Sequence, residues 1–378
     1  MRPWEPSETA YAVALASLDS LGPTRFAALT SALLPSEAWD CLRHGGGRFP
    51  LDVAAALSEA RTSRKLLDRW SSAARRIDPH ELLTQCAAAG VGVVTRGEAG
   101  YPARLLEDPQ PPAVLFFLGS LRSIQEPLVA IVGTRRATPY GRAVAHELGE
   151  VLASCGVTVV SGLASGIDAA AHRGALRHAA LAPPVGVVAT GPDVVYPPRN
   201  RDLWEHVAEV GLLFGETPPG VRPQRWRFPS RNRLVATLAH VVVVVESHER
   251  GGALITAELA LERQRQVAAV PGSIRSPASR GTNRLLSEGA HVVSDVADVV
   301  GLVGNCAQSV GLDVGDAAPA GPSSHDERRV LDALGWEPAT SDDVVERSRL
   351  PLVTVTVLLD RLEARRVIAR DANRFHQL

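Results

Sequence analysis

Short runs of apolar, mostly β-branched residues recur through the middle of the chain, and they constrain the fold more than any other feature. The runs are LVAIVG (128–133), VTVVSG (157–162), VGVVATG (185–191), VGLLFGE (210–216), HVVVVVES (240–247), QVAAVPG (266–272) and AHVVSD (290–295). Strands that read as continuous apolar runs are buried on both faces, as in a parallel sheet covered by helices. Helical patterns separate many of the runs, so the sequence predicts an α/β domain with a doubly wound, mostly parallel sheet.

The pattern changes on either side of this region, so the 378 residues divide into domains. Residues 1–78 contain short amphipathic stretches that predict a small helical domain, and residues 79–303 contain the predicted strands. Residues 304–324 are rich in Gly, Ala, Pro and Ser and predict a linker. Residues 325–378 predict a compact C-terminal domain.

The basic residues are almost all arginine, and this composition excludes one large class of enzymes. Lys65 is the single lysine, and it lies in TSRKLL rather than after a glycine-rich loop. A Walker P-loop needs a lysine at that place, so nucleotide hydrolysis through such a site is excluded. The net charge is −1, so a basic binding surface has to be local.

The cysteines and the N-terminus indicate where the protein works. Cys41, Cys86, Cys155 and Cys306 lie far apart without a C-x-x-C motif, so we expect reduced thiols in the cytoplasm and no metal site. The N-terminus carries early acids and no uninterrupted apolar core, which is not typical of a signal peptide. The longest apolar run, around 241–245, is too short to span a bilayer. We therefore expect no membrane association.

Glycines and arginines follow the predicted strands. In a doubly wound sheet, ligands bind outside the carboxyl ends of the strands. The segments expected there are GTRRATPYG, SGLASGID, TGPDVVYPPRN, GETPPG, ESHERGGALITAE and PGSIRSPASRGTN. Glycine permits close backbone approach, helix N-termini favour anions, and arginine offers forked donors to phosphate oxygens. These segments predict a phosphate-binding crevice formed by separate loops.

Residues 222–233, RPQRWRFPSRNR, hold five arginines in twelve positions with no acid among them. An isolated arginine cluster is most often solvated surface, but several clusters at one sheet edge favour an anion site. Trp226 and Phe228 lie among these arginines, and of the two alternatives we favour core packing over base stacking.

Asp168 and His172 have the i, i+4 spacing of an acid–base pair or half of a metal site. We favour a structural explanation, in which Ser165 and Asp168 form a capping box at the start of a helix. Thr282 and Asn283 similarly have the pattern of a helix cap.

Ordered motifs across the central region resemble those of the DprA/Smf family, the DNA-processing factors of bacterial natural transformation. The matching segments are AIVGTRRATPYG, SGLASGIDAAAH, DVVYPPRN, FPSRNRLVATLAHVVVVVES with GGALITA, and VAAVPG with GTNRLLSEGA, and residues 90–119 match the entry into the family's Rossmann-like domain. The resemblance implies an extended Rossmann-like fold. LDSLGPTRFAAL (18–29) resembles the family's sterile-alpha-motif-like or helix-hairpin-helix region, and the C-terminal segment resembles a winged helix.

The resemblance also implies a binding protein without catalytic residues or cofactors. Family members bind single-stranded DNA, form homodimers and load the RecA recombinase onto DNA. The family's phosphate-contacting arginine corresponds to Arg135, its RNR signature to Arg231, Asn232 and Arg233, and the arginine before the V-A-V-P-G strand to Arg265. The full set of expected ssDNA-binding positions is Gly133, Thr134, Arg135, Arg136, Ser161, Gly162, Gly166, Arg231, Asn232, Arg233, Gly251, Arg265 and Asn283.

The sequence departs from the family pattern at three places. Gly215 and Gly251-Gly252-Ala253 stand where the family usually has a serine, and Thr190-Gly191-Pro192 replaces a glycine-rich turn. The first two changes remove hydroxyl donors, and the proline stiffens its loop. The arginines, by contrast, match the family pattern.

The C-terminal segment lacks the charge of a typical DNA reader. From Asp326 onward it carries ten acids and nine arginines, and the presumed recognition helix offers Thr354 and Thr356 but no Asn or Gln. A helix that reads a DNA groove carries a basic footprint. We therefore favour a protein-contact role for this domain.

Two enzyme classes are the alternatives. ERGGALITAE partly matches the signature of Rossmann-like nucleoside-monophosphate phosphoribohydrolases through Gly251, Gly252, Thr256 and Glu258, but the proline and the glycine spacing are missing. A dinucleotide-dependent oxidoreductase requires G-x-G-x-x-G after the first strand, which is absent here. Both alternatives are disfavoured against a DNA-binding protein.

Overall fold

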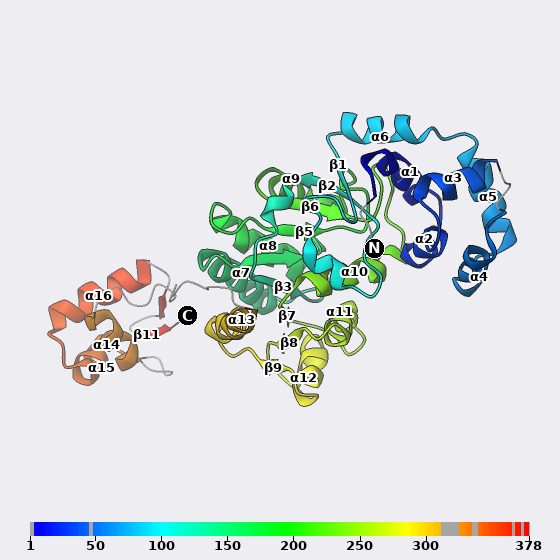
Figure 1. Ribbon diagram of the computed structural model, residues 1–378. Coiled ribbons are helices and arrows are strands. Elements are labelled where there is room, and N and C mark those ends of the chain that lie inside the picture. The colour runs from blue at the N-terminus through cyan, green and yellow to red at the C-terminus, as the bar shows by residue number, and fades with distance from the viewer. Residues whose placement is uncertain are drawn as a thin grey trace. The chain divides into compact units, whose positions relative to one another are not determined.

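The computed structural model describes residues 4–44, 48–310, 325–334, 339–364, 367–371 and 374–377. The chain folds as two compact units, Met1–Gly315 and Asp316–Leu378 (Figure 1). In the described parts of both units, no helix has the length and apolarity needed to cross a membrane.

The larger unit is built on a nine-stranded sheet with the order β1-β2-β6-β5-β4-β3-β7-β8-β9. The strands from β6 to β9 in this order pair in parallel, whereas β1–β2 and β2–β6 pair antiparallel. The strands are β1 (Gly92–Thr95), β2 (Val114–Gly119), β3 (Leu128–Val132), β4 (Thr158–Ser161), β5 (Val185–Val187), β6 (Leu212–Gly215), β7 (Val241–Val244), β8 (Gln266–Ala269) and β9 (His291–Val292). Every apolar run that the sequence singled out contains one of these strands, which confirms the predicted mostly parallel sheet.

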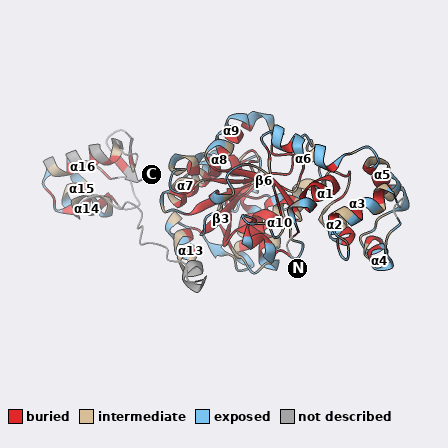
Figure 2. Ribbon diagram, turned by 45° about the horizontal axis from the view of Figure 1, so that its top comes forward, coloured by how far each residue is buried: buried red, intermediate tan, exposed pale blue. Residues whose placement is uncertain are grey.

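Both faces of the sheet are covered by helices (Figure 2). One face packs against α10 (Arg227–Leu238), α11 (Gly252–Glu262) and α12 (Arg280–Ser287). The other packs against α7 (Pro139–Ser154), α8 (Ile167–Ala175) and α13 (Val296–Val310), while α9 (Arg201–Val210) contacts β2 and β6. The valines of β7 are fully buried between these layers, which explains why the strand is apolar at every position.

The arginines of residues 227–233, for which the sequence pattern predicted no helix, lie in helix α10. The segment is helical from Arg227 because Leu234, Val235 and Leu238 recur at helical spacing and are buried against the sheet. A helix places Arg231 and Arg233 on different sides of its axis, so the two arginines have different surroundings.

The N-terminal helices form a second core in the same unit. They are α1 (Pro6–Ala16), α2 (Pro23–Leu29), α3 (Pro35–Arg43), α4 (Leu51–Glu59), α5 (Arg64–Ala74) and α6 (Pro79–Ala88). Trp39 and Trp70 lie in the centre of this core, which extends onto the sheet through Phe116 of β2. These helices continue to Ala88, beyond the predicted boundary at residue 78, and they pack directly on the antiparallel edge of the sheet within the same unit.

The smaller unit contains α14 (His325–Leu334), α15 (Ser341–Ser348), α16 (Leu352–Ala364) and an antiparallel hairpin of β10 (Ile368–Asp371) and β11 (Arg374–Gln377). Three helices followed by a hairpin are the element order of a winged helix. Thr340, one residue before the first helical residue, caps α15 in a reciprocal pair with Asp343. Helix α13 continues to Val310, beyond the predicted boundary at 303, and residues 311–324 of the predicted linker lie outside the described residues.

Candidate functional site

A crevice opens at the carboxyl ends of β3, β4 and β7. Strand β3 pairs with β4 on one side and β7 on the other, so the order of the strands reverses here. In doubly wound sheets this topological switch point is where ligands bind. The crevice encloses about 310 Å³, and the residues that line it include Gly133, Thr134, Arg135, Gly162, Asp168, Phe228, Arg231, Asn232, Ser247, Gly251, Gly252 and Thr256.

The N-terminus of α11 forms one wall of the crevice. Gly251 is the N-cap residue and provides no side-chain cap, and Gly251, Gly252 and Ala253 all line the space. The first backbone N–H groups of a helix lack partners within the helix, and together with the helix dipole they favour an anion. The loss of the family's serine at this wall removes a hydroxyl group and leaves the backbone donors in place.

Arg135 is exposed at the mouth of the crevice. Its guanidinium carbon lies 4.9 Å from the centre of the Phe228 ring, which in turn contacts the ring of Tyr196 with a 5.4 Å centroid separation. In the part of the chain that the structure describes, no carboxylate pairs with Arg135. An arginine held over a ring keeps its forked donors available to an anion.

Arg231 lines the base of the crevice and is buried, with 8% of the residue exposed. Its Nη1 donates to the backbone oxygen of Gly162 at 2.9 Å and to that of Val187. Burial lowers the pKa of Arg231 to about 10, with the nearby Asp168 acting in the opposite direction, so the side chain is charged at neutral pH. A Cβ on Gly162 would lie 2.3 Å from this guanidinium, so the glycine makes room for Arg231.

Asp168 corrects the predicted capping box. Its carboxylate accepts hydrogen bonds from the backbone N–H groups of Gly162 (3.1 Å) and Ala164 (3.4 Å), and Ser165 instead accepts from Nε of Arg199 at 2.8 Å. Burial raises the pKa of Asp168, and the charge of Arg231 opposes this shift. Asp168 therefore orders the loop after β4 and supplies a counter-charge for Arg231.

His172 is fully buried in α8, and burial lowers its pKa to about 4. It is neutral at physiological pH and does not line the crevice, which agrees with the structural role that we favour for it.

Other predicted positions line the crevice or hold its loops in place. The Ser161 hydroxyl donates to the backbone oxygen of Ile131 at 2.6 Å. A side chain on Gly133 would collide with Ile167, and one on Gly166 would collide with the backbone of Thr134. Gly166 also has a φ of +85°, which favours glycine. Thr134 accepts from the backbone N–H of Arg136, whose side chain is exposed at the rim.

Arg233 lies in a separate group of buried charges. Its Nη1 is 3.2 Å from a carboxylate oxygen of Asp108 and its Nη2 is 2.5 Å from Glu216. Arg263 also pairs with Asp108, at 3.0 Å. We call Asp108, Glu216, Arg233 and Arg263 the buried arginine network. Two carboxylates of the protein already neutralise Arg233, so the structure does not bring it to the crevice.

Arg265 and Asn283 also lie outside the crevice lining. Arg265 precedes β8, which runs parallel to β7, so it lies at the opposite edge of the sheet, where it pairs with Glu107. Asn283 bonds both backbone groups of Gly272 with its side-chain amide and thereby fixes the turn after β8. It does not cap α12, whose N-cap residue is Ser279.

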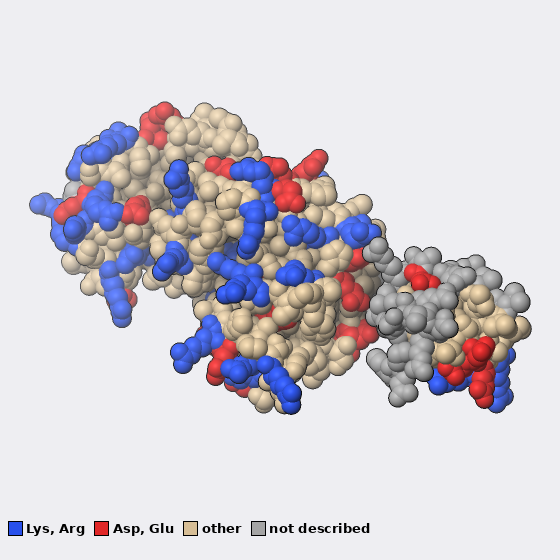
Figure 3. Space-filling view, turned by 180° about the vertical axis from the view of Figure 1, so that it is seen from behind, with Lys and Arg blue, Asp and Glu red and all other residues tan. Residues whose placement is uncertain are grey.

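We expected Phe228 and Trp226 to pack in the core, and this expectation was wrong. Phe228 is half-buried at the crevice, and 43% of Trp226 is exposed. The sequence pattern also did not single out Arg199. This residue is exposed, and its hydrogen bond to Ser165 holds it close to the loop that follows β4. Arg199 lies in the segment TGPDVVYPPRN, which follows a predicted strand, and this position after a strand was the signal that could have identified it. Figure 3 shows one face of the larger unit, on which many basic side chains lie with acidic side chains among them.

The arrangement contains no obvious pair of groups for acid–base chemistry among the crevice residues. Asp168 is bound to backbone N–H groups, and Glu258 is exposed on α11 and does not line the space. What the crevice offers is backbone N–H groups, guanidinium groups and one aromatic ring, which suit phosphate and base contacts.

Two family models match the chain. "DNA recombination-mediator protein A" covers residues 92–304, and "DprA winged helix domain" covers residues 315–373. A DNA processing protein DprA of Mycobacterium tuberculosis is 38% identical over 340 residues, which cover 86% of this chain and 83% of that protein.

Two solved structures are similar. DNA processing protein A of Streptococcus pneumoniae has a TM-score of 0.63 and 29% identity, over 80% of this chain and 98% of that one. DNA processing protein A of Helicobacter pylori, whose structure was described for its single-stranded DNA binding mode, has a TM-score of 0.52 and 28% identity, over 57% of this chain and 96% of that one.

Proposed function

This chain belongs to the DprA/Smf family of DNA-processing proteins, and on that premise we propose that it binds single-stranded DNA independently of sequence in the crevice beside β3. Arg135 and the N-terminus of α11 contact phosphates, and Phe228 provides a ring on which a base stacks. The observation that carries the proposal is the exposed Arg135, held over Phe228 at the topological switch point.

Arg231 has a different part in the proposed site. Its Nη1 donates hydrogen bonds to the backbone oxygens of Gly162, which follows β4, and Val187, which ends β5. Its charge lies at the base of the crevice. It therefore contributes a positive potential to the bound strand while it holds the loops after β4 and β5 together. Asn232, which accepts from Nε of Arg231 at 3.3 Å, lines the crevice beside it.

The finer parts of the proposal follow the family. We propose that the protein acts in the cytoplasm as a homodimer, that it protects incoming strands during natural transformation, and that it loads the RecA recombinase onto them. No catalytic step is included, because the crevice residues offer binding groups rather than a nucleophile with a base.

The test is a titration of fluorescent single-stranded and duplex oligonucleotides at several salt concentrations. For single strands, log K falls by about 0.7 per phosphate neutralised for each tenfold rise in salt. We expect Arg135→Ala to weaken binding to all sequences by roughly ten- to a hundredfold, because a charged hydrogen bond is worth about 1.5–3 kcal/mol, and to flatten the salt slope by about 0.7.

Arg122→Ala is the matched control, since Arg122 is exposed on the short helix after β2 and does not line the crevice. It should bind as the parent does. Parent-like affinity and salt slope in Arg135→Ala would contradict the proposed site. Release of free base from a nucleoside monophosphate by the purified protein would favour the phosphoribohydrolase alternative.

A further inference from the structure

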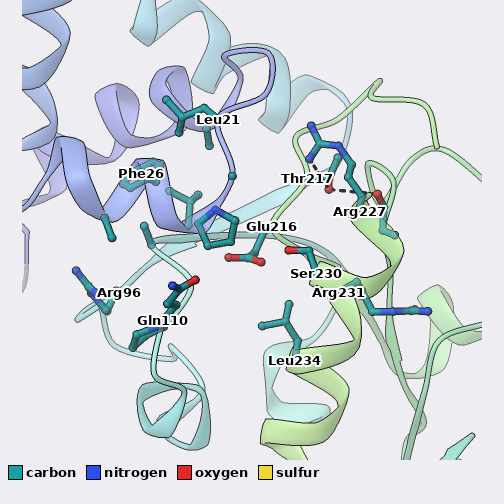
Figure 4. Close-up of a pocket in the computed structure, with 18 of the residues that line it drawn as sticks. Leu21, Phe26, Arg96, Gln110, Glu216, Thr217, Arg227, Ser230, Arg231 and Leu234 are labelled. Carbon is teal, nitrogen blue, oxygen red and sulfur yellow. Dashed lines mark hydrogen bonds between the residues drawn. The ribbon is translucent and has the colours of Figure 1, made fainter. Parts of the chain in front are cut away.

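A second cavity of about 260 Å³ lies on the other side of α10, between the N-terminal helices and the sheet (Figure 4). Helix α2 and the loop before it form one wall through Leu21 and Phe26, and α10 forms the opposite wall through Ser230 and Leu234. None of the expected ssDNA-binding positions except Arg231 lines this cavity.

One carboxylate dominates the chemistry of the cavity. Glu216 follows β6, its side chain is 20% exposed, and Figure 4 shows its carboxylate among the lining residues between Phe26 and Ser230. One oxygen of the Glu216 carboxylate pairs with Arg233, which does not line the cavity. A carboxylate held in place in this way accepts N–H donors from a ligand that enters the cavity.

The remaining walls suit a flat, partly apolar ligand. Leu21 and Phe26 are buried apolar residues of the lining, and the exposed indole of Trp226 lies next to Gly22 at the cavity. Arg227 stacks on this indole at 4.5 Å and donates to Thr217 at 3.2 Å. Rings and a guanidinium plane are the surfaces on which nucleobases stack.

The cavity and the crevice lie on opposite sides of α10 and share one lining residue. Arg231 lines both spaces, and Leu234 and Val235 line one each. Arg227 lies one helical turn before Arg231 on α10 and lines the cavity, so a strand that leaves the crevice toward the start of this helix meets a further cation beside the cavity.

We infer that this cavity is a nucleobase-binding site that takes a guanine, with Glu216 accepting hydrogen bonds from the base edge. The inference rests on the proposed single-stranded DNA binding and adds a preference at one position of a strand that the crevice holds independently of sequence. Guanine fits the carboxylate because its N1–H and exocyclic amino group present two adjacent donors, whereas thymine presents one N–H flanked by two carbonyl oxygens. The guanine comes either from the bound strand or from a free nucleotide.

The experiment uses the full-length protein and strands that differ at one central position. A thymidine 12-mer is compared with strands carrying one deoxyguanosine or one deoxyinosine, which lacks the exocyclic amino group, and dGMP is titrated separately. We expect the deoxyguanosine strand to bind about tenfold more tightly than the thymidine strand, with deoxyinosine between them.

Two variants test the site. Ala27→Phe adds a ring from an exposed position of α2 that lines the cavity, and Ala55→Phe makes the same change on exposed α4, away from it. Ala27→Phe should abolish the guanine preference and keep thymidine-strand binding, and Ala55→Phe should keep both. Glu216→Gln should also lose the preference; if this variant unfolds, Ala27→Phe alone decides.

The outcomes separate this inference from the proposed function. Equal affinity for all three strands in the parent, or a preference that survives Ala27→Phe, overturns the guanine site while strand binding stands. Binding of dGMP that Ala27→Phe removes, without binding of any strand, supports a free-nucleotide site and overturns the proposed function.

Discussion

Arg231 and Arg233 are two residues apart in the same helix, but they have different surroundings. Arg231 is bonded to backbone oxygens beside an open crevice, and Arg233 is paired with buried carboxylates. Arg231 is held by backbone oxygens and faces an open crevice with one buried carboxylate nearby. Arg233 faces Asp108 and Glu216. Within the buried arginine network these two carboxylates balance the two positive charges of Arg233 and Arg263. The difference teaches that residues of one motif can have different roles: Arg233 is paired directly with two carboxylates, whereas Arg231 makes no direct ion pair in the described part of the chain and keeps its charge beside the crevice, with Asp168 nearby.

The electrostatics of Asp108 show how strongly the network is built. Its side chain is fully buried, and burial alone would raise its pKa. The hydrogen bond from Thr237 and the charge of Arg233 outweigh this effect, so the pKa of Asp108 is lowered. The network therefore depends on its arginines, whereas the crevice retains unneutralised positive charge.

The largest expected effect is the loss of stability in Arg233→Ala. Removal of one partner leaves buried carboxylates uncompensated, which costs about 3–5 kcal/mol in the free energy of unfolding. Urea unfolding measures this cost, with the exposed Arg222→Ala as a control that changes it by less than about 0.5 kcal/mol. If Arg233→Ala were as stable as the control and had lost DNA affinity, Arg233 would belong to the binding region and the comparison would fail.

The second expected effect is a loss of stability in acid, because the larger unit contains two buried histidines, His172 and His240. Burial lowers the pKa of both His172, near Arg231, and His240, near Arg104, to about 4. Between pH 6.5 and 4 the unfolded chain takes up protons that the folded protein does not, so stability falls as the pH falls through this window and the loss is complete below it.

Each histidine contributes up to about 3 kcal/mol to this loss. Unfolding curves at pH 7 and pH 5 measure the difference for the parent and for His172→Gln. The variant should show a smaller pH dependence, and an unchanged one would mean that His172 does not titrate in this window.

The third effect should be confined to binding. Phe228→Leu keeps an apolar side chain at the crevice and removes the ring below Arg135, so we expect single-stranded DNA to bind about 1–2 kcal/mol more weakly. Fluorescence titration measures this change, and thermal unfolding checks that the fold is retained. A stability loss larger than the affinity loss would place Phe228 in the core, as the sequence pattern suggested.

The smallest effect is expected from Arg265→Ala, because Arg265 pairs with a Glu107 side chain that is 53% exposed. A pair with one exposed partner contributes about 1 kcal/mol or less to stability, although the Arg265 side chain is itself 14% exposed and also donates to the backbone oxygen of Thr237. Arg265 lies at the edge of the sheet opposite the crevice. Affinity for single-stranded DNA should therefore be unchanged. A loss comparable to that of Arg135→Ala would extend the binding surface to this edge.

The strands were predictable because each is a continuous apolar run, and two-sided burial imposes that composition locally. Gly133, Arg135, Gly162 and Gly251 were placed at the crevice for a related reason, since residues that follow parallel strands meet at one edge of the sheet. Helix α10 was not predicted because its arginines and Pro229 obscure a short apolar face. The aromatic residues were misplaced because composition does not distinguish a ring in the core from one at a rim.

The sequence by itself determined the order of buried strands and exposed loops, because burial and turn geometry act on neighbouring residues. The tertiary structure alone decided which arginines are free. Arg233 meets Asp108 and Gln110 across more than a hundred residues, and Arg265 meets Glu107 across a similar separation. Charge neutralisation depends on distances in space, so long-range packing selects Arg135 and Arg231 for the crevice and excludes Arg233 and Arg265 from it.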